Sequence, residues 1–423
     1  MRTRLTLAIH CCCLTGIYAQ VKPPAAAPVL TLQDAVREAV EHNLGLLAER
    51  FNIPVAQARV VQARLRPNPI LMAGLDYQDW LGTGFTFENA AGPPEFTTRL
   101  DVPIETAHKR RYRTEVAQQA LSVAQLQLAN TTRQVILDVQ NAFTDVVAAK
   151  QALDLARQNL KALDAIVEVN ANRVRAGDLA KVELLRSRLA ALQFNNAVRQ
   201  AELRLATSRK QLQLLLGRGG PPVVDVAPPP VPSINLPPLA ELITESIRYR
   251  PDLEALRRDQ ARSLADVRLQ IAQGKVDFDI GVQYHHQYDT AHGDALAVFA
   301  TAPLPVWNRN QGEIARARVE SNQAAARIKA QQAAITNEVE NAYAQYTTSR
   351  ALLETIESEM LQQARDVRET MEYSYRRGEA SLIEFLDAQR AFNDTMQSYY
   401  DARADYARSL YLLESTTGRT VNP

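Results

Sequence analysis

Two kinds of hydrophobic pattern alternate along this chain, and each predicts a different element. In four short segments, apolar and polar residues follow one another in turn, the pattern of a strand with one buried face. The clearest is 276–285, where Val, Phe, Ile, Val and Tyr alternate with Asp, Asp, Gly, Gln and His. The pattern is looser in 71–78 and 96–102 and least clear in 296–301. We predict four strands that form two hairpins, each around a polar loop.

A long helix is predicted after each hairpin. Alternating steps of four and three residues from Leu121 to Val174 meet an apolar residue at thirteen of sixteen positions. The same stepping from Ala325 to Val367 meets ten in thirteen. A heptad pattern of this length predicts coiled-coil packing. A helix of ~65 to 70 residues extends about 100 Å, which is more than a single globular domain needs.

The positions of glycine and proline indicate that the chain is duplicated. Val102-Pro103-Ile104 recurs as Leu304-Pro305-Val306, 202 residues later. Arg175-Ala176-Gly177-Asp178 recurs as Arg376-Arg377-Gly378-Glu379, 201 residues later, and Gly217-Arg218 recurs as Gly418-Arg419 at the same offset. A near-constant offset over this length is an internal repeat. Each half begins with a shorter predicted helix, over 31–65 with an interruption at Pro54 and over 239–272.

The chain divides into four parts. Residues 1–19 read as a signal peptide, with a basic start, a short apolar stretch and Ala19 before the cleavage point. The three cysteines, Cys11 to Cys13, lie inside it, so the mature chain has none; acylation of one of them is the alternative. The first repeat covers 20–218 and the second 239–423. Between them, 219–238 is rich in proline and predicts an extended connector.

Composition and charge limit the function. The 423 residues carry 48 Lys and Arg against 47 Asp and Glu, a net charge of +1, which argues against a nucleic-acid partner. Beyond residue 20 no stretch approaches ~18 uninterrupted apolar residues, so the chain can cross a membrane only with strands. Four strands cannot close a barrel, whereas three copies would supply twelve. The alternative is a soluble helical protein with two surface hairpins.

The two faces of the predicted strands suit a shared barrel. Their apolar residues would contact outer-membrane lipid. The opposite face would line a water-filled lumen with the charged residues Asp76, Arg99, Asp101, Asp277 and Asp279.

An exported, duplicated chain with a hairpin and then a long helix in each half resembles the TolC family of outer-membrane efflux proteins. The resemblance covers essentially all of the mature chain. It implies a mainly α fold with a pair of β-hairpins: a long coiled-coil helical tunnel in the periplasm and a transmembrane β-barrel shared by a homotrimer, with four strands per chain and twelve per trimer. It also implies docking onto an inner-membrane pump through a periplasmic adaptor protein. The segment 303–313, PLPVWNRNQGE, is most similar to the branch that serves heavy-metal efflux pumps.

Two glycine turns mark the tips of the predicted helical hairpins. Gly177 and Gly378 can adopt the left-handed conformation that ends a helix. Asp178 and Glu379 follow them, and we expect their carboxylates at the start of the returning helix, where the dipole favours negative charge. The bland interpretation is that these residues only form tight turns. The family resemblance implies that such tips close the periplasmic mouth and contact the adaptor.

Glu384 and Asp387 are the candidate gate residues. A spacing of three puts both carboxylates on one helix face, and threefold symmetry would turn them into two acidic rings that favour cations. The resemblance matches them to an acidic pair at the constriction; the alternative is a solvated acidic face. Glu183 and Arg186 occupy the equivalent places in the first half. Ala380 stands where some family members have an arginine that ties the tips together, which puts that salt bridge in doubt.

No pattern in the chain indicates catalysis. There is no Ser-His-Asp order, phosphate-binding glycine loop or zinc spacing, so we predict no enzyme, no cofactor and no metal site. His285, His286 and His292, with Asp289 and Asp294, are interpreted as a solvated loop between strands. The predicted function is a passive exit duct for substrates, metal ions being favoured. The alternatives are a duct for drugs or secreted proteins, and a soluble periplasmic coiled-coil adaptor or scaffold.

Overall fold

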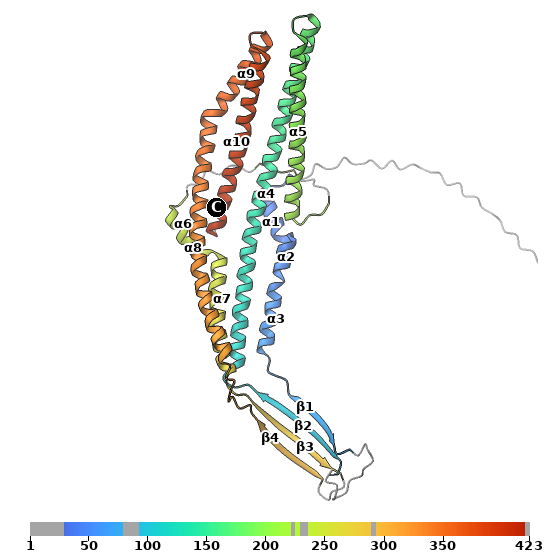
Figure 1. The fold of residues 1–423 in the computed structure, drawn as a ribbon, viewed down its shortest axis with the longest axis vertical. Helices are drawn as coiled ribbons and strands as arrows, with labels where there is room; N and C mark the ends of the chain where they lie inside the picture. Colours follow the sequence, from blue (N-terminus) through green and yellow to red (C-terminus); the bar gives the residue numbers. More distant parts are fainter. Residues whose placement is uncertain (1–28, 79–92, 221–224, 229–235, 289–292, 419–423) are drawn as a thin grey trace, which may run out of the picture.

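The computed structural model describes residues 29–78, 93–220, 225–228, 236–288 and 293–418. They form an elongated molecule with a sheet at one end and the tips of two helical hairpins at the other (Figure 1). The predicted signal peptide at 1–19 lies outside the described residues. Within the described segments, none of the helices combines the length and the hydropathy needed to span a bilayer.

Four antiparallel strands form one sheet in the order β1-β2-β3-β4. Their bounds confirm the four predicted strands: β1 (Ile70–Asp76), β2 (Glu95–Ile104), β3 (Phe278–Gln287) and β4 (Asp294–Thr301). The two hairpins are joined through β2 and β3, so that strands from both halves share the sheet. In the described chain β1 and β4 pair on one side only, which leaves both outer edges open.

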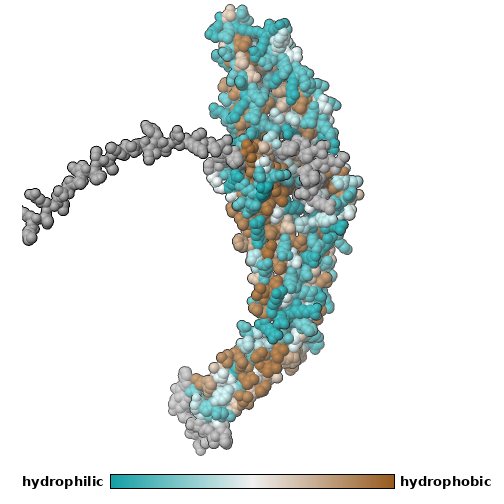
Figure 2. Space-filling model, turned by 180° about the vertical axis from the view of Figure 1, so that it is seen from behind, coloured by the Kyte–Doolittle hydropathy of each residue, from teal (hydrophilic) through white to brown (hydrophobic). Residues whose placement is uncertain are grey.

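The pairing register separates an apolar from a polar face. Leu71, Leu100, Val282 and Val298 lie in one row across the four strands, and all of them are exposed. Figure 2 shows a broad apolar surface over this end of the molecule. Four of the five predicted lumen residues lie on the opposite face by strand alternation: Asp76, Arg99, Asp101 and Asp279.

Asp277 departs from this prediction. It precedes β3 and joins the sheet to the helices: its carboxylate accepts hydrogen bonds from Lys109 Nζ at 2.7 Å and from the backbone N–H of Thr106 at 2.8 Å. Burial raises the pKa of this carboxyl group, but the hydrogen bonds from Lys109 and Thr106 outweigh burial and hold the pKa below its usual value.

An ion pair on the polar face explains a glycine in the middle of β3. Arg99 Nε donates to Asp101 at 2.8 Å, and its guanidinium lies 4.4 Å from the ring centre of Phe299. Both charged side chains cover Gly281, where an added Cβ would come within 2.2 Å of Asp101 Oδ1. A larger residue at this position would displace the ion pair.

The first predicted helix is three helices. These are α1 (Leu32–His42), α2 (Leu44–Arg50) and α3 (Asn52–Arg64), with breaks at Asn43 and Phe51. The predicted interruption at Pro54 is wrong, because Pro54 lies in the first turn of α3, where its missing N–H is not needed. Asn43 makes the break, since its side chain accepts from Leu46 N at 3.0 Å and donates to Leu215 O at 2.9 Å.

The helix predicted over 239–272 is also interrupted. It consists of α6 (Leu239–Tyr249) and α7 (Pro251–Gln273), with Arg250 between them. Pro251 disfavours a helical conformation at the residue before it and suits the first position of α7. The buried Arg250 guanidinium pairs with Asp252 at 2.6 Å and with Glu338 of the next long helix.

The long helices occur where they were predicted. In the first half, α4 (Lys109–Ala176) runs unbroken for 68 residues and α5 (Lys181–Leu215) returns beside it. In the second half, α8 (Gln311–Thr355) and α9 (Leu361–Arg377) are separated by a five-residue π-helix, Ile356–Met360, which the heptad pattern did not reveal. The returning helix is α10 (Leu382–Thr417), which packs against α4 and so joins the two hairpins.

The predicted connector is anchored where the structure describes it. Leu30 and Val226 form a parallel bridge, with Leu30 N donating to Asp225 O at 2.9 Å and Ala227 N donating to Leu30 O at 3.2 Å. Val226 is buried in the core that α1, α4 and α5 share. The boundaries at 20–218, 219–238 and 239–423 remain predictions.

Candidate functional site: the tips of the helical hairpins

Both tips use the same backbone turn. Gly177 ends α4 with φ at 87°, and Gly378 ends α9 with φ at 82°, which confirms the left-handed conformation predicted for each. Asp178 N donates to Arg173 O and Glu379 N donates to Ser374 O, both at 2.9 Å. An added Cβ would meet nothing within 4 Å at either glycine. The backbone angle, not lack of space, therefore requires glycine.

The second tip has a capping box. Ser381 precedes α10, and its side chain accepts from the backbone N–H of Glu384 at 3.3 Å. In return, Glu384 Oε2 accepts from the backbone N–H of Ser381 at 2.7 Å. The expectation that Asp178 and Glu379 stand at the start of the returning helices is wrong. The residues before those helices are Ala180 and Ser381, and the first-turn carboxylates belong to Glu183 and Glu384.

The first tip lacks this cap. Ala180 takes the place of Ser381 and has no side chain that could accept a hydrogen bond from α5. Glu183 therefore pairs with Arg186 at 2.9 Å instead of reaching back to the turn. Arg186 is thus the partner of Glu183 within α5, and Ala380 on the other tip has no charge to offer it. The two tips are equivalent in backbone but different in their side-chain bonds.

Glu384 and Asp387 are both exposed on α10, whereas Phe385 and Ala388 beside them are buried. Asp387 also lies 3.5 Å from Arg390, but both side chains are largely exposed, so this pair contributes little. Hydrogen bonds from the backbone and the side chain of Ser381 lower the pKa of Glu384 below its usual value. The predicted spacing of the acidic pair is thus present, with one carboxylate also serving as the helix cap.

A contact between the two hairpins was missed by the sequence analysis. The buried Tyr375 of α9 donates its hydroxyl hydrogen to Asn170 Oδ1 on α4 at 2.7 Å, and its ring stacks on Phe385 with centres 5.5 Å apart. Arg173 extends from α4 to the same place, where it donates to the carbonyl oxygens of Tyr375 and Arg376. This cluster of side chains holds α4 of the first hairpin to the end of α9 in the second.

A second polar contact lies farther from the tips on the same two hairpins. Buried Asn159 of α4 accepts from Gln389 at 3.0 Å and donates to Asn393 at 2.7 Å, and both partners belong to α10. Asn170, in the contact nearer the tips, occupies an apolar heptad position in the sequence, and this was the available signal for that contact. A buried polar residue in a coiled coil fixes the register of the helices, because only one alignment satisfies it.

The histidine set does not form a loop. His285 and His286 belong to β3, which confines the loop to fewer residues than predicted. His286 Nδ1 lies 2.9 Å from Asp294 Oδ1 at the start of β4, while His292 and Asp289 lie outside the described residues. In the described segments, no group of three or more His, Cys, Asp and Glu side chains is arranged to hold a metal ion.

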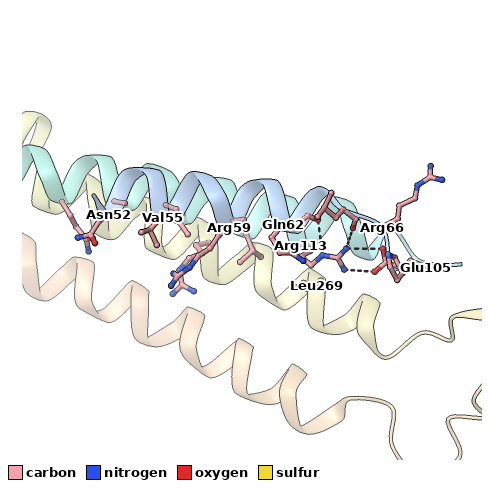
Figure 3. Close-up of a pocket in the computed structure, with 18 residues that line it drawn as sticks. Asn52, Val55, Arg59, Gln62, Arg66, Glu105, Arg113 and Leu269 are labelled. Atoms are coloured by element: carbon pink, nitrogen blue, oxygen red, sulfur yellow. Dashed lines mark hydrogen bonds and ion pairs between the residues drawn. The ribbon is translucent and has the colours of Figure 1, made fainter. Parts of the chain in front are cut away.

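A groove of about 810 Å³ lies on α4 between α3 and α7, near the sheet (Figure 3). Its floor is apolar and its end is closed by Arg113, which donates to Glu105 Oε1 at 2.7 Å and to the carbonyl oxygen of Leu65 at 3.0 Å. Arg59 and Arg66 line the same groove, and no carboxylate within the described part of the chain pairs with either of them. The groove contains no nucleophile or acid–base pair.

The sheet has an apolar outer face, and it is joined to helical hairpins that are held together by a polar contact at their far ends. This combination is typical of one subunit of a membrane duct. The family model that matches this chain is that of the outer membrane efflux proteins, over residues 35–218 and again over 242–419. The chain belongs to this family. It is therefore an outer-membrane efflux channel protein with a periplasmic helical extension, not an enzyme, and the alternative of a soluble scaffold does not hold.

Relatives and solved structures agree with this assignment. The chain is 24% identical to the cobalt-zinc-cadmium resistance protein CzcC of Cupriavidus metallidurans, over 94% of this chain and 92% of the relative. It is 22% identical to nodulation protein T of Rhizobium leguminosarum, over 94% and 86%. The crystal structure of CusC matches the fold with a TM-score of 0.77 at 16% identity, over 92% of each chain.

Replacing Tyr375 by Phe should loosen the tips. The substitution keeps the stacking on Phe385 but leaves the buried Asn170 without its donor, at a cost of about 1–3 kcal/mol. We expect a higher single-channel conductance in planar bilayers than for the unmodified protein. Tyr373→Phe is the matched control, because Tyr373 is exposed on the same helix. Equal conductance of the Tyr375 and Tyr373 variants would show that this contact does not hold the mouth.

Proposed function

We propose that three copies of this chain assemble into a homotrimer, in which the three sheets close into a twelve-stranded barrel and the hairpins into a periplasmic tunnel. TolC-family channels are trimeric members of tripartite efflux systems. The observation that carries the proposal for this chain is an apolar stripe on α5 that has no neighbour within the described part of one copy.

The stripe has the spacing of a coiled-coil interface. Its exposed members follow one another at steps of three and four residues: Val182, Leu185, Leu189 and Leu192. The buried residues Ser187, Ala190 and Val198 face α4 from the opposite side of the same helix. A helix in a closed ring has two neighbours on opposite sides, so this distribution fits a second helix from another copy.

The opposite edge of the molecule offers a complementary surface. There the helices α8 and α9, on the far side of the molecule from α5 (Figure 1), expose Val319, Leu352 and Val367. At the sheet end, β1 and β4 have open edges whose backbone groups need partners in lipid. Joining one edge of each copy to the opposite edge of the next gives a head-to-tail interface that can close into a ring.

Leu189→Glu should weaken the trimer. The new carboxylate would be buried without a partner between α5 and the next copy, which costs several kcal/mol. Native mass spectrometry in detergent is expected to show a shift from trimer to monomer. Ala197→Glu is the control: it adds a carboxylate to an exposed position of α5 that lies about 100° around the helix from the centre of the stripe. A Leu189→Glu protein that remains as trimeric as the control would contradict the proposed edge.

The second part of the proposal concerns the mouth of the tunnel. Threefold repetition would place the Glu384 and Asp387 carboxylates in two rings, which favour cations. We assign to the turns at Gly177, Asp178, Gly378 and Glu379 the contact with a periplasmic adaptor protein, which links the channel to an inner-membrane pump. The support for this role is their position at the far end of the hairpins from the sheet (Figure 1).

The double variant Glu384→Gln and Asp387→Asn should reduce cation selectivity. Glutamine keeps the acceptor that caps α10, whereas alanine would remove charge and cap together. Reversal potentials in planar bilayers measure the selectivity. Glu183→Gln is the control, because it removes the equivalent carboxylate at the first tip. Unchanged selectivity in the double variant would exclude these residues from the gate.

The cation selectivity of the unmodified channel should also depend on pH. Because the pKa of Glu384 is lowered, its charge is present above the usual carboxylate pKa of ~4.3 and is lost only as the pH falls through the lower, folded value. Cation preference should therefore persist on acidification further than it would for an ordinary glutamate.

The proposed cargo is metal ions. The support is the similarity to one relative, a cobalt-zinc-cadmium resistance protein, and the segment 303–313. Drugs or secreted proteins are the alternative cargo, since other relatives are named multidrug resistance outer membrane proteins. Deleting the gene and measuring survival separates the two. Sensitivity to zinc, cobalt or cadmium alone supports the metal proposal, and sensitivity only to dyes and detergents contradicts it.

A further inference from the structure

Six exposed cations surround the junction between the sheet and the helices. They come from the end of α3, the start of α4, the end of α7 and the loop before α8, and we name them the basic collar: Arg64, Arg66, Arg110, Arg111, Lys275 and Arg309. None of them forms an ion pair with any described residue. Figure 3 shows Arg66 extending away from the groove on α4.

Hydrogen bonds hold these four segments side by side at the same height along the long axis of the molecule. Arg113 of α4 donates to the carbonyl oxygens of Ala63 and Leu65 at the end of α3, at 3.2 and 3.0 Å. Lys109 Nζ donates to Lys275 O just after α7, at 2.7 Å. Asn310, which precedes α8, donates to Gln270 O of α7 at 2.8 Å. The collar therefore belongs to one layer of the molecule, although its members are far apart in sequence.

Most acidic residues of this layer are already engaged by other cations. Glu105 pairs with Arg113, Glu115 with Arg268, and Asp277 with Lys109, at 2.6 to 2.7 Å. Glu313 of α8 pairs with Arg316, and Asp279 at the start of β3 has no ion pair with a described residue. The six cations of the collar outnumber these remaining carboxylates, which leaves the layer with an excess of positive charge. A second copy would bring the same excess, so neighbouring copies do not supply the missing anions.

The two collar arginines on α4 do not stabilise that helix. Arg110 and Arg111 occupy the first turn of α4, where the helix dipole disfavours cations, and no acidic residue accompanies them there. His108 before the helix makes no side-chain cap. Basic residues at this position are slightly unfavourable for the helix, and an anion beside them would remove that cost.

Apolar side chains project beside the collar. In the loop between β4 and α8, Trp307 is 88% exposed, Leu304 83% and Val306 59%, and Arg309 follows directly. Tryptophan next to basic residues is the combination typical of the boundary between bilayer and water, because the ring is apolar and its N–H is polar.

The apolar face of the sheet, measured from the collar to the polar row at its other end, has the length needed to cross a bilayer. Outward residues of β3 run from Phe278 to Tyr284 and end in the polar row of His286 and Asp294. This interval of six to eight residues spans roughly 20–26 Å at ~3.3 Å per residue, close to the ~25 Å apolar band of membrane barrels. Figure 2 shows the apolar surface giving way to a hydrophilic one at the sheet–helix junction.

We propose that the basic collar binds the phosphate groups of anionic phospholipids in the periplasm-facing leaflet of the outer membrane, with Trp307 in the headgroup region. The proposal rests on the outer-membrane location and not on the cargo of the channel. Its failure would leave the duct intact, since duct activity is measured separately by conductance.

Fluorescence of Trp307 tests the position of the loop. The chain has two tryptophans, so Trp80→Phe leaves Trp307 as the single reporter. The full-length protein is reconstituted into phosphatidylethanolamine–phosphatidylglycerol vesicles that carry brominated acyl chains. Quenching by bromines near the headgroups, more than by those near the bilayer centre, supports the proposal. Quenching only by aqueous acrylamide, or by neither agent because a neighbouring copy covers the ring, overturns it.

Lipid retention tests the charges. Native mass spectrometry of the purified trimer measures bound phosphatidylglycerol against phosphatidylethanolamine. Arg110→Gln with Arg111→Gln should lower the preference for phosphatidylglycerol by at least about fivefold. Arg175→Gln with Arg377→Gln removes the same charge from exposed positions near the tips, far from the collar, and should change nothing. Equal retention in the two double variants, both confirmed as trimers in the same spectra, would overturn the lipid role.

Discussion

The open edges of the four-stranded sheet are the constraint on which the rest of this molecule depends. Within lipid, a backbone N–H or C=O without a partner costs several kcal/mol, so β1 and β4 cannot remain as they are in one copy. The helices obey the same requirement in another form, because α5 exposes leucines on the side opposite its own hairpin partner. Sheet and helices therefore require a neighbouring copy along the same two edges. A rotation about one threefold axis would supply that neighbour to the sheet and to the helices alike.

The polar contacts between α4 and the second hairpin determine how the two halves lie against each other. Apolar heptads alone would allow the helices to slip by one repeat, since leucine and alanine pack almost equally well after such a shift. Asn159 with Gln389 and Asn393, and Asn170 with Tyr375, remove that freedom because only one alignment pairs them. The register of the tips, and thus the geometry of the mouth, follows from these buried side chains.

Much of the fold could be predicted from the sequence, because strand alternation and long heptads are local and repeat twice. The break at Asn43 could not, since it depends on a distant carbonyl of Leu215. Pro251 was a local signal for the break at Arg250, but the ion pair between the buried Arg250 and the exposed Glu338, 88 residues apart, was not visible in the sequence. At the tips, the glycine turns and the Ser381 capping box were readable from residue type and spacing. The Tyr375–Asn170 contact joins residues 205 apart, so the sequence showed only a polar residue at an apolar heptad position and not the partner of that residue.

The missing cap at Ala180 has a consequence for the rim of the assembled tunnel. In each copy, the returning helix of the second repeat, α10, begins with amides that are bonded to a serine and a glutamate. The returning helix of the first repeat, α5, begins without a side-chain cap. Around a threefold axis, firm and frayed ends would alternate. The six ends would therefore not be equally stable, and the rim would have threefold and not sixfold symmetry.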